Sequence, residues 1–85
     1  ITSTSTGITL DDTHHSVLCD GTFTITLPQA STCQGRIYVI KNTGTGTITV
    51  DGDGSENIDG AGTYSMSTQY QTVTIQSSGT AWFIL

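Results

Sequence analysis

Apolar and hydroxyl-bearing side chains alternate along several short stretches of this chain, most clearly in residues 22–27, 47–50 and 72–76. A period of two places successive side chains on opposite faces of a strand, so that one face is buried and the other meets water. Threonine suits the wet face because its branched β-carbon fits the pleat while its hydroxyl group binds water. No segment shows apolar residues at helical spacing. The sequence therefore predicts an all-β fold with less than about a tenth of its residues in helices.

Segments rich in glycine, aspartate, asparagine and serine separate the expected strands, because these residues tolerate the backbone angles that tight turns need. Three of these segments are interpreted as β-hairpin turns: Asp20-Gly21, residues 42–46 and residues 77–79. With weaker strands expected at residues 8–10 and 64–67, the chain has about six to eight short strands. The expected architecture is a compact antiparallel sandwich or prism.

Two of the expected strands, residues 36–41 and 82–85, carry apolar side chains on both faces. A strand of this kind is covered on both sides in a folded protein. The chain has few large apolar residues: 19 of its 85 residues are Val, Ile, Leu or Phe, whereas 27 are Ser or Thr. A chain of this length buries only about 60–65% of its unfolded surface. We therefore expect the second cover to come from other copies of the chain.

The charge of the chain restricts its partners. Seven acidic residues against Arg36 and Lys41 give a net charge of −5. Nucleic-acid binding needs a basic surface that neutralises phosphates, and anionic membrane surfaces repel an acidic protein. No apolar run approaches the roughly 20 residues that are needed to cross a bilayer. We expect neither nucleic-acid binding nor membrane insertion.

No pattern of catalytic or metal-binding residues stands out. Adjacent residues of an extended chain point to opposite faces, so His14 and His15, beside two aspartates, are expected to be solvated. Residues 51–57 have carboxylates at alternate positions but lack the glycine and the bidentate glutamate of an EF-hand loop, so a turn is expected. Cys19 and Cys33 either form one disulfide bridge or act as small apolar residues, and both alternatives stay open. We expect no enzyme, no metal and no cofactor.

The aromatic residues divide into two groups. Tyr and Trp side chains stack on sugars and mark binding surfaces where they are exposed. Tyr64 and Tyr70 are the expected exposed pair; a structural role is favoured for both, and contact with a receptor or glycan is the alternative. The residues expected in the core or at a subunit interface are Phe23, Ile37, Tyr38, Val39, Ile40, Trp82, Phe83 and Ile84.

Several segments, taken in their order, resemble a module at the C-terminal ends of bacteriophage tail-fibre and related virion fibre proteins. They are FTITLP at residues 23–28, GRIYVIKNT at 35–43, TGTITV at 45–50, IDG at 58–60 and QYQTVTIQSSGTAWFIL at 69–85, with SVLCD at 16–20 as the opening strand. The resemblance spans residues 9–85, and the combined order is more specific than any single segment.

This resemblance implies a non-enzymatic, homotrimeric fibre-tip domain over residues 8–85, preceded in residues 1–7 by a linker or the end of a shaft. Its role would be trimerisation and attachment to a host cell-surface glycan or protein, in a virion assembled in the host cytoplasm. The cytoplasm keeps thiols reduced, so a disulfide between Cys19 and Cys33 is less expected in such a protein. The alternative is a monomeric carbohydrate-binding module of a larger secreted protein. An exposed polar or aromatic pocket would favour receptor binding, and a featureless Ser/Thr surface would favour a structural role.

Overall fold

The computed structural model describes residues 1–85 and confirms the all-β expectation, since it contains one turn of 3-10 helix and no α-helix. It has nine strands, more than the six to eight expected, because residues 2–4 also form a strand. The strands are β1 (Thr2–Thr4), β2 (Ile8–Thr9), β3 (Ser16–Cys19), β4 (Phe23–Thr26), β5 (Ile37–Asn42), β6 (Ile48–Asp51), β7 (Thr63–Met66), β8 (Thr72–Ser77) and β9 (Trp82–Ile84). The 3-10 turn η1 spans Ala30–Thr32, between β4 and β5. None of the elements is a helix with the length and hydrophobicity that crossing a membrane requires.

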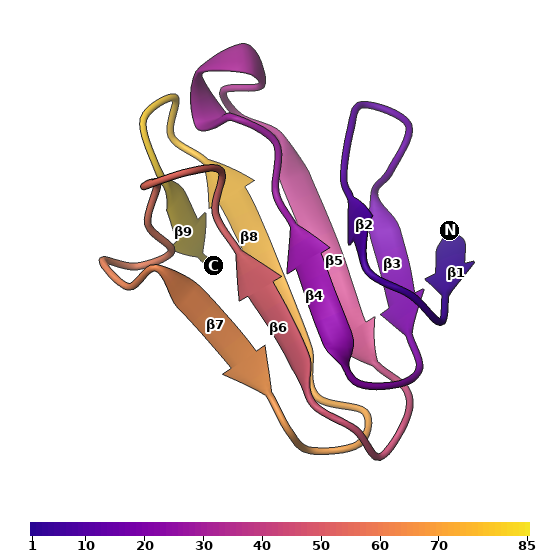
Figure 1. The fold of residues 1–85 in the computed structure, drawn as a ribbon. Coiled ribbons are helices and arrows are strands. Elements are labelled where there is room, and N and C mark those ends of the chain that lie inside the picture. Colours follow the sequence, from indigo (N-terminus) through magenta and orange to yellow (C-terminus); the bar gives the residue numbers. More distant parts are fainter.

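The strands form two sheets packed face to face (Figure 1). One sheet has five strands in the order β1-β3-β5-β8-β9, and the other has four in the order β2-β4-β6-β7. The first six strands alternate between the two sheets, so the pairs β1–β2, β3–β4 and β5–β6 each form one coil around the core. Successive coils stack in parallel register, as Val17 opposite Ile40 and Ile25 opposite Val50 illustrate.

The parallel stacking corrects the antiparallel architecture that the sequence was expected to give. Antiparallel pairing is confined to the C-terminal strands, where β7 pairs with β6, and β8 pairs with β5 and β9. The two-layer, all-β arrangement itself is as expected. A period of two marks a strand with one wet face, but it is the same whether the neighbouring strand runs parallel or antiparallel. The alternation therefore predicted the strands without predicting their relative directions.

Two turns interpreted as hairpins are arches that connect the sheets, so both interpretations were wrong. Asp20-Gly21 leads from β3 to β4, and residues 42–46 lead from β5 towards β6, and in each case the two strands belong to different sheets. The arches are stacked closely, because a Cβ atom on Gly46 would collide with the carbonyl oxygen of Gly21. Glycine and aspartate permit either kind of turn. The third hairpin, at residues 77–79, is confirmed by the antiparallel pairing of β8 and β9.

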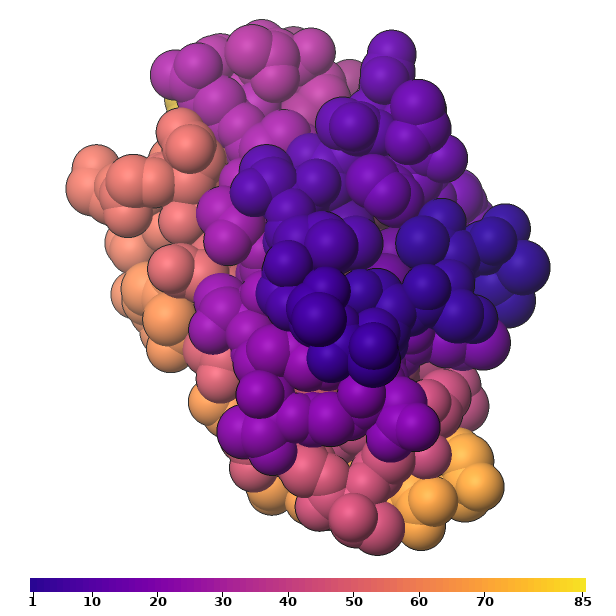
Figure 2. Space-filling view, turned by 45° about the vertical axis from the view of Figure 1, so that its right-hand side comes forward, coloured from indigo at the N-terminus to yellow at the C-terminus, as the bar shows by residue number.

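The N-terminal segment forms the first coil of the stack. Thr2–Thr4 lie within the residues 1–7 that were expected to be a linker, and they pair with β3 as strand β1. Ile8–Thr9 pair with β4 as strand β2. Figure 2 shows this segment, in indigo, covering much of the surface on that side of the molecule.

The core lies between the two sheets and consists of 15 buried apolar residues. Tyr38 and Trp82 are the largest of the completely buried side chains, and their ring centroids lie 5.7 Å apart with the ring planes inclined by 33°. This separation is within the range in which aromatic pairs attract one another.

The two outer faces of the sandwich differ in their chemistry. The outer side of the four-stranded sheet carries hydroxyl groups and one carboxylate, from Thr9, Thr24, Thr26, Thr49, Asp51, Thr63 and Ser65. The outer side of the five-stranded sheet carries apolar residues among hydroxyl and amide groups and the ammonium group of Lys41. We call its apolar members the outer apolar face: Leu18, Ile37, Val39, Phe83 and Leu85.

Candidate functional site

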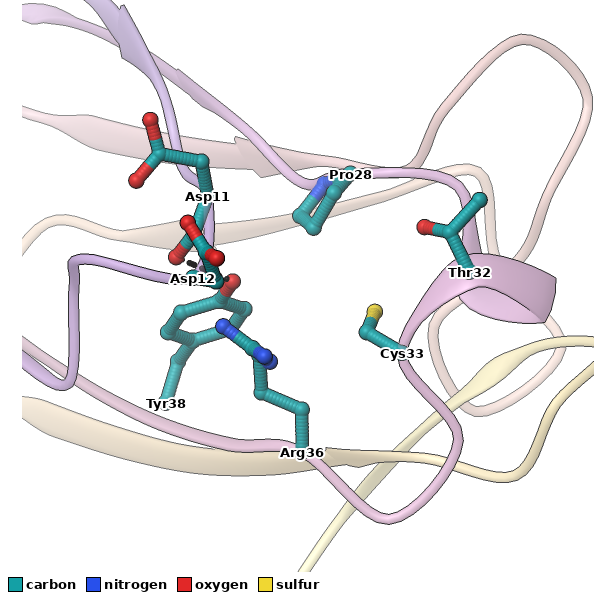
Figure 3. A pocket seen from close by; sticks show the side chains of 7 residues that line it. All are labelled: Asp11, Asp12, Pro28, Thr32, Cys33, Arg36 and Tyr38. Atoms are coloured by element: carbon teal, nitrogen blue, oxygen red, sulfur yellow. Dashed lines mark hydrogen bonds between the residues drawn. The ribbon is translucent and has the colours of Figure 1, made fainter.

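A single pocket of about 300 Å³ opens at one end of the sandwich (Figure 3). Seven residues line it: Asp11, Asp12, Pro28, Thr32, Cys33, Arg36 and Tyr38. The coil topology brings them together, because the connections from β2 to β3 and from β4 to β5 both lie at this end (Figure 1). The volume lies at the small end of the range for small-molecule binding sites.

The connection after β2 supplies two acidic residues, and the first of them shapes the loop. Thr13 donates hydrogen bonds from its backbone N–H and its hydroxyl group to Asp11 Oδ1. These bonds hold the pKa of Asp11 below its ordinary value. His14 Nδ1 lies 3.1 Å from the same carboxylate oxygen. The Asp11 carboxylate is therefore committed to its own loop, and Figure 3 shows it turned away from the hollow.

Asp12 and Arg36 are the charged side chains that leave hydrogen-bonding capacity free in the pocket. The Asp12 carboxylate accepts no hydrogen bond from the chain, and the one contact within 4.0 Å between a basic and an acidic side chain joins His14 to Asp11. Arg36 enters from the start of β5, with its backbone N–H bonded to the Cys33 carbonyl oxygen at 2.9 Å. A carboxylate only accepts hydrogen bonds and a guanidinium only donates them. The pocket thus presents an acceptor and a fork of donors that do not satisfy each other.

Tyr38 connects the pocket to the core. Its side chain is buried, and its hydroxyl group donates a hydrogen bond to the Asp11 carbonyl oxygen at 2.8 Å. Burial raises the pKa of Tyr38, and hydrogen bonding with the Arg36 side chain, together with its positive charge, opposes this rise. The phenol is therefore a neutral group at physiological pH, and it holds the loop of Asp11 against β5.

The opposite wall is formed by Pro28, η1 and the residue that follows it. The Thr32 hydroxyl group donates to the Gln29 carbonyl oxygen at 2.7 Å, and the Cys33 thiol lies 3.6 Å from the same oxygen. Figure 3 shows Thr32 and Cys33 across the hollow from Asp12 and Arg36. This wall is less polar than the charged side, because it offers a proline ring and a sulfur atom.

The two cysteines are unpaired, which answers the question that the sequence left open. Cys19 is completely buried in the core, and burial raises the pKa of its thiol to about 11. Cys33 is half-buried and lines the pocket. Cys19 acts as a small apolar residue, whereas Cys33 is the thiol that reagents in solution can reach.

The remaining histidine and the acidic turn have local structural contacts. His15 Nδ1 lies 3.1 Å from Ser16 Oγ. In the turn at residues 51–57, the two carboxylate oxygens of Glu56 accept hydrogen bonds from the backbone N–H of Ala30 at 2.9 and 3.1 Å, which fixes η1 in place. No group of three His, Cys, Asp or Glu side chains converges as a metal site would require.

Tyr64 and Tyr70 lie away from the pocket. Tyr70 is 62% exposed in the connection between β7 and β8, at the other end of the sandwich (Figure 1). Lys41 Nζ donates to the Tyr70 carbonyl oxygen at 3.0 Å and lies 5.8 Å from the ring centroid. Tyr64 is half-buried and packs against the core. Their role as receptor contacts stays a prediction, and of the two only Tyr70 presents most of its side chain to solvent.

The residues expected in the core or at a subunit interface fall into three groups. The completely buried ones are Tyr38, Ile40 and Trp82. Those partly buried against the core are Phe23 and Ile84. Those on the outer apolar face are Ile37, Val39 and Phe83. Within one chain, the strands that carry apolar residues on both faces are therefore covered on one face only.

No protein family, curated protein sequence or solved structure matches this chain. The function of this chain is therefore inferred from its own fold, outer faces and pocket, and from the order of its sequence motifs.

The sequence did not predict that the seven pocket residues lie close together. Asp12 was noticed only as a neighbour of the histidines, and Arg36 only as one of two cations. These two residues lie in the connections from β2 to β3 and from β4 to β5, which are neighbours because the coils stack in parallel. The available signal was the scarcity of cations, since Arg36 lies in an acidic chain whose only other basic residue is Lys41.

Proposed function

We propose that this chain is a non-enzymatic, homotrimeric tip domain of a virion fibre, which joins three copies of the fibre and attaches to a host cell-surface glycan or protein. The observation that carries the proposal is the outer apolar face of the five-stranded sheet, formed by Leu18, Ile37, Val39, Phe83 and Leu85. The opposite outer face of the same sandwich carries hydroxyl groups and one carboxylate. This difference favours a molecule whose four-stranded sheet faces solvent and whose five-stranded sheet contacts a partner.

The outer apolar face includes large side chains that are open to solvent. Phe83 is 48% exposed and Leu85 is 67% exposed. Ile37 lies in the same cross-strand row as Phe83, with Gln76 between them. Clustered apolar side chains of this kind mark interaction surfaces, and left uncovered they promote aggregation. Covering them removes apolar area from water, which stabilises an assembly by about 25 cal/mol for each Å².

The distribution of charge favours a second copy of the chain as the partner. None of the seven acidic residues lies on a strand of the five-stranded sheet, whereas Asp51 lies on the outer side of the four-stranded sheet. Copies with a net charge of −5 repel one another, and the repulsion is smallest where the acidic groups are farthest from the contact. Asp59 lies at one edge of this sheet, where its Oδ1 accepts a hydrogen bond from the backbone N–H of Ile84 at 3.0 Å. Away from that edge, the outer side of the five-stranded sheet is the surface at which copies meet with the least electrostatic cost.

The number of copies and the location in a virion rest on the sequence resemblance to tail-fibre modules. A cyclic arrangement covers an equivalent surface on every copy and leaves no open end. Two unpaired cysteines fit assembly in a reducing host cytoplasm.

A monomeric carbohydrate-binding module of a secreted protein is the second candidate. The pocket with its free acceptor and donors favours this function as much as it favours receptor attachment by a fibre tip. The two candidates differ in their oligomeric state, which makes assembly the property to measure.

The test is a pair of double variants examined by sedimentation-velocity ultracentrifugation. Phe83→Asp with Leu85→Asp places two carboxylates on the outer apolar face and is expected to convert the trimer to folded monomers. Thr24→Asp with Ser65→Asp makes the same change in charge at exposed positions of the other outer face and is expected to leave the trimer intact. Equal sedimentation of the two variants and the unmodified chain would contradict the proposed interface.

A further inference from the structure

We propose that the pocket binds one neutral sugar ring through two adjacent hydroxyl groups, with Asp12 accepting a hydrogen bond from one and Arg36 donating to the other. Sugar binding by the pocket does not depend on the proposed function, but its role as the receptor contact of a fibre tip does. The pocket then supplies the receptor contact of the fibre tip.

The chemistry of the two free groups carries the proposal. Asp12 and Arg36 face one hollow, and their charged atoms lie more than 4.0 Å apart, since the one contact within that distance between a basic and an acidic side chain is His14 with Asp11. Two opposite charges that do not pair leave room for a ligand group between them. Adjacent hydroxyl groups match this arrangement, since one hydroxyl donates to the carboxylate while its neighbour accepts from the guanidinium. Hydrogen bonds to charged groups are also stronger than those between neutral groups.

The shape of the pocket restricts the ligand to one ring. Its volume of about 300 Å³ is at the small end of the range for ligand sites. The Pro28 ring and Cys33 provide an apolar patch across from the charged side, on which the C–H face of a sugar can pack (Figure 3). The Thr32 hydroxyl group donates its one hydrogen bond to the Gln29 carbonyl oxygen, so it can only accept a hydrogen bond from a ligand.

The charge and the apolar wall of the pocket each disfavour one competing ligand. Asp11, Asp12 and Arg36 leave the lining with an excess of negative charge, and the chain as a whole carries −5. A sugar that bears a carboxylate, such as a sialic acid, is repelled by this field. A small zwitterionic amino acid such as glycine would pair with both charged groups, but it has no ring to cover the Pro28 wall.

The test uses the unmodified chain and follows its backbone amides by NMR during titration with methyl mannoside, methyl galactoside and methyl glucoside. We expect saturable shifts for at least one glycoside, confined to the loops of Asp12 and Thr32–Arg36. N-acetylneuraminic acid and glycine serve as the charged comparison ligands. Shifts that are absent for all three glycosides, or stronger for either charged ligand, would overturn the proposal.

Two substitutions and a control assign the binding to the named groups. Asp12→Asn keeps the side-chain shape and removes the charge, and Arg36→Gln replaces the guanidinium by a shorter neutral amide. Each is expected to weaken glycoside binding by about tenfold or more. Asp53→Asn removes the same charge as Asp12→Asn from an exposed turn and should bind as the unmodified chain does. Equal binding by all three variants would contradict the roles of Asp12 and Arg36.

Cys33 offers a readout that needs no variant. Iodoacetamide is expected to alkylate Cys33 and not the buried Cys19 of the folded chain. A glycoside bound in the pocket should slow the alkylation of Cys33. An unchanged rate at a saturating glycoside concentration would mean that the sugar binds elsewhere, which would contradict the proposed pocket. Failure of sugar binding with an intact trimer rejects only this inference, and sugar binding by a monomer rejects only the trimeric fibre tip.

Discussion

Asn42 shows how one buried polar residue joins separate parts of the fold. Its side-chain N–H₂ group donates to the carbonyl oxygens of Gly46 and Met66 at 2.8 and 3.0 Å, and its Oδ1 accepts from the backbone N–H of Gly44 at 3.2 Å. These bonds fasten the arch between β5 and β6 to the end of β7. The side chain is completely buried, so no water replaces a partner that is lost.

Asn42→Ala is expected to lower the free energy of unfolding by about 2–4 kcal/mol, because it removes three hydrogen bonds and leaves buried backbone groups unsatisfied. Urea denaturation followed by the fluorescence of Trp82, the only tryptophan, measures this at one fixed protein concentration. Gln69→Ala is the control, since the Gln69 amide makes one exposed hydrogen bond to the Thr43 carbonyl oxygen. A loss from Asn42→Ala no larger than that of the control would contradict the role of Asn42.

Cys19 predicts a loss of stability in alkaline solution. Its thiol ionises near pH 9.0 in an unfolded chain, and burial raises its pKa to about 11 in the folded chain. Between these values the unfolded state releases a proton that the folded state keeps, so stability is complete below pH 9 and falls as the pH rises towards 11. We expect a loss of about 2 kcal/mol from this group at the upper end. Unfolding of the native chain and of Cys19→Ala across this range measures the effect, and equal slopes would contradict it.

The strands were predictable from local sequence, but their partners were not. Residues 22–27 and 72–76 alternate in character because each strand has one buried face, and β4 and β8 form there. Whether β4 pairs with β3 or with β6 depends on where the arch at Asp20-Gly21 directs the chain, and both outcomes satisfy the same pattern. The pocket was missed for the same reason, since Asp12 and Arg36 meet only through the stacking of coils.

The stacked arches predict that glycine is required at position 46. A Cβ atom there would collide with the Gly21 carbonyl oxygen and the Thr22 hydroxyl group, so Gly46→Ala must push two coils apart. We expect a loss of about 1–3 kcal/mol in unfolding experiments. Gly62→Ala is the matched control, because nothing lies within 4 Å of a Cβ atom at that position. The control is expected to be neutral or slightly stabilising. Equal stability of the two variants would mean that the arches are not stacked as described.

The whole molecule combines an outer face rich in hydroxyl groups, an outer face with apolar side chains and a pocket at one end. The sequence predicted that residues 36–41 and 82–85 carry apolar residues on both faces, and Ile37, Val39 and Phe83 do lie on the outer side of their sheet. One chain supplies a cover for the inner side only. The central claim is that further copies of the chain cover the outer side.

Light scattering coupled to size-exclusion chromatography of the unmodified 85 residues tests that claim most directly. The molar mass obtained from light scattering does not depend on the shape of the particle, so a flat or elongated assembly does not distort the result. We predict a particle with three times the chain mass of 8.9 kDa at micromolar concentration. A particle with the mass of one chain would contradict the homotrimeric fibre tip and favour the monomeric carbohydrate-binding module.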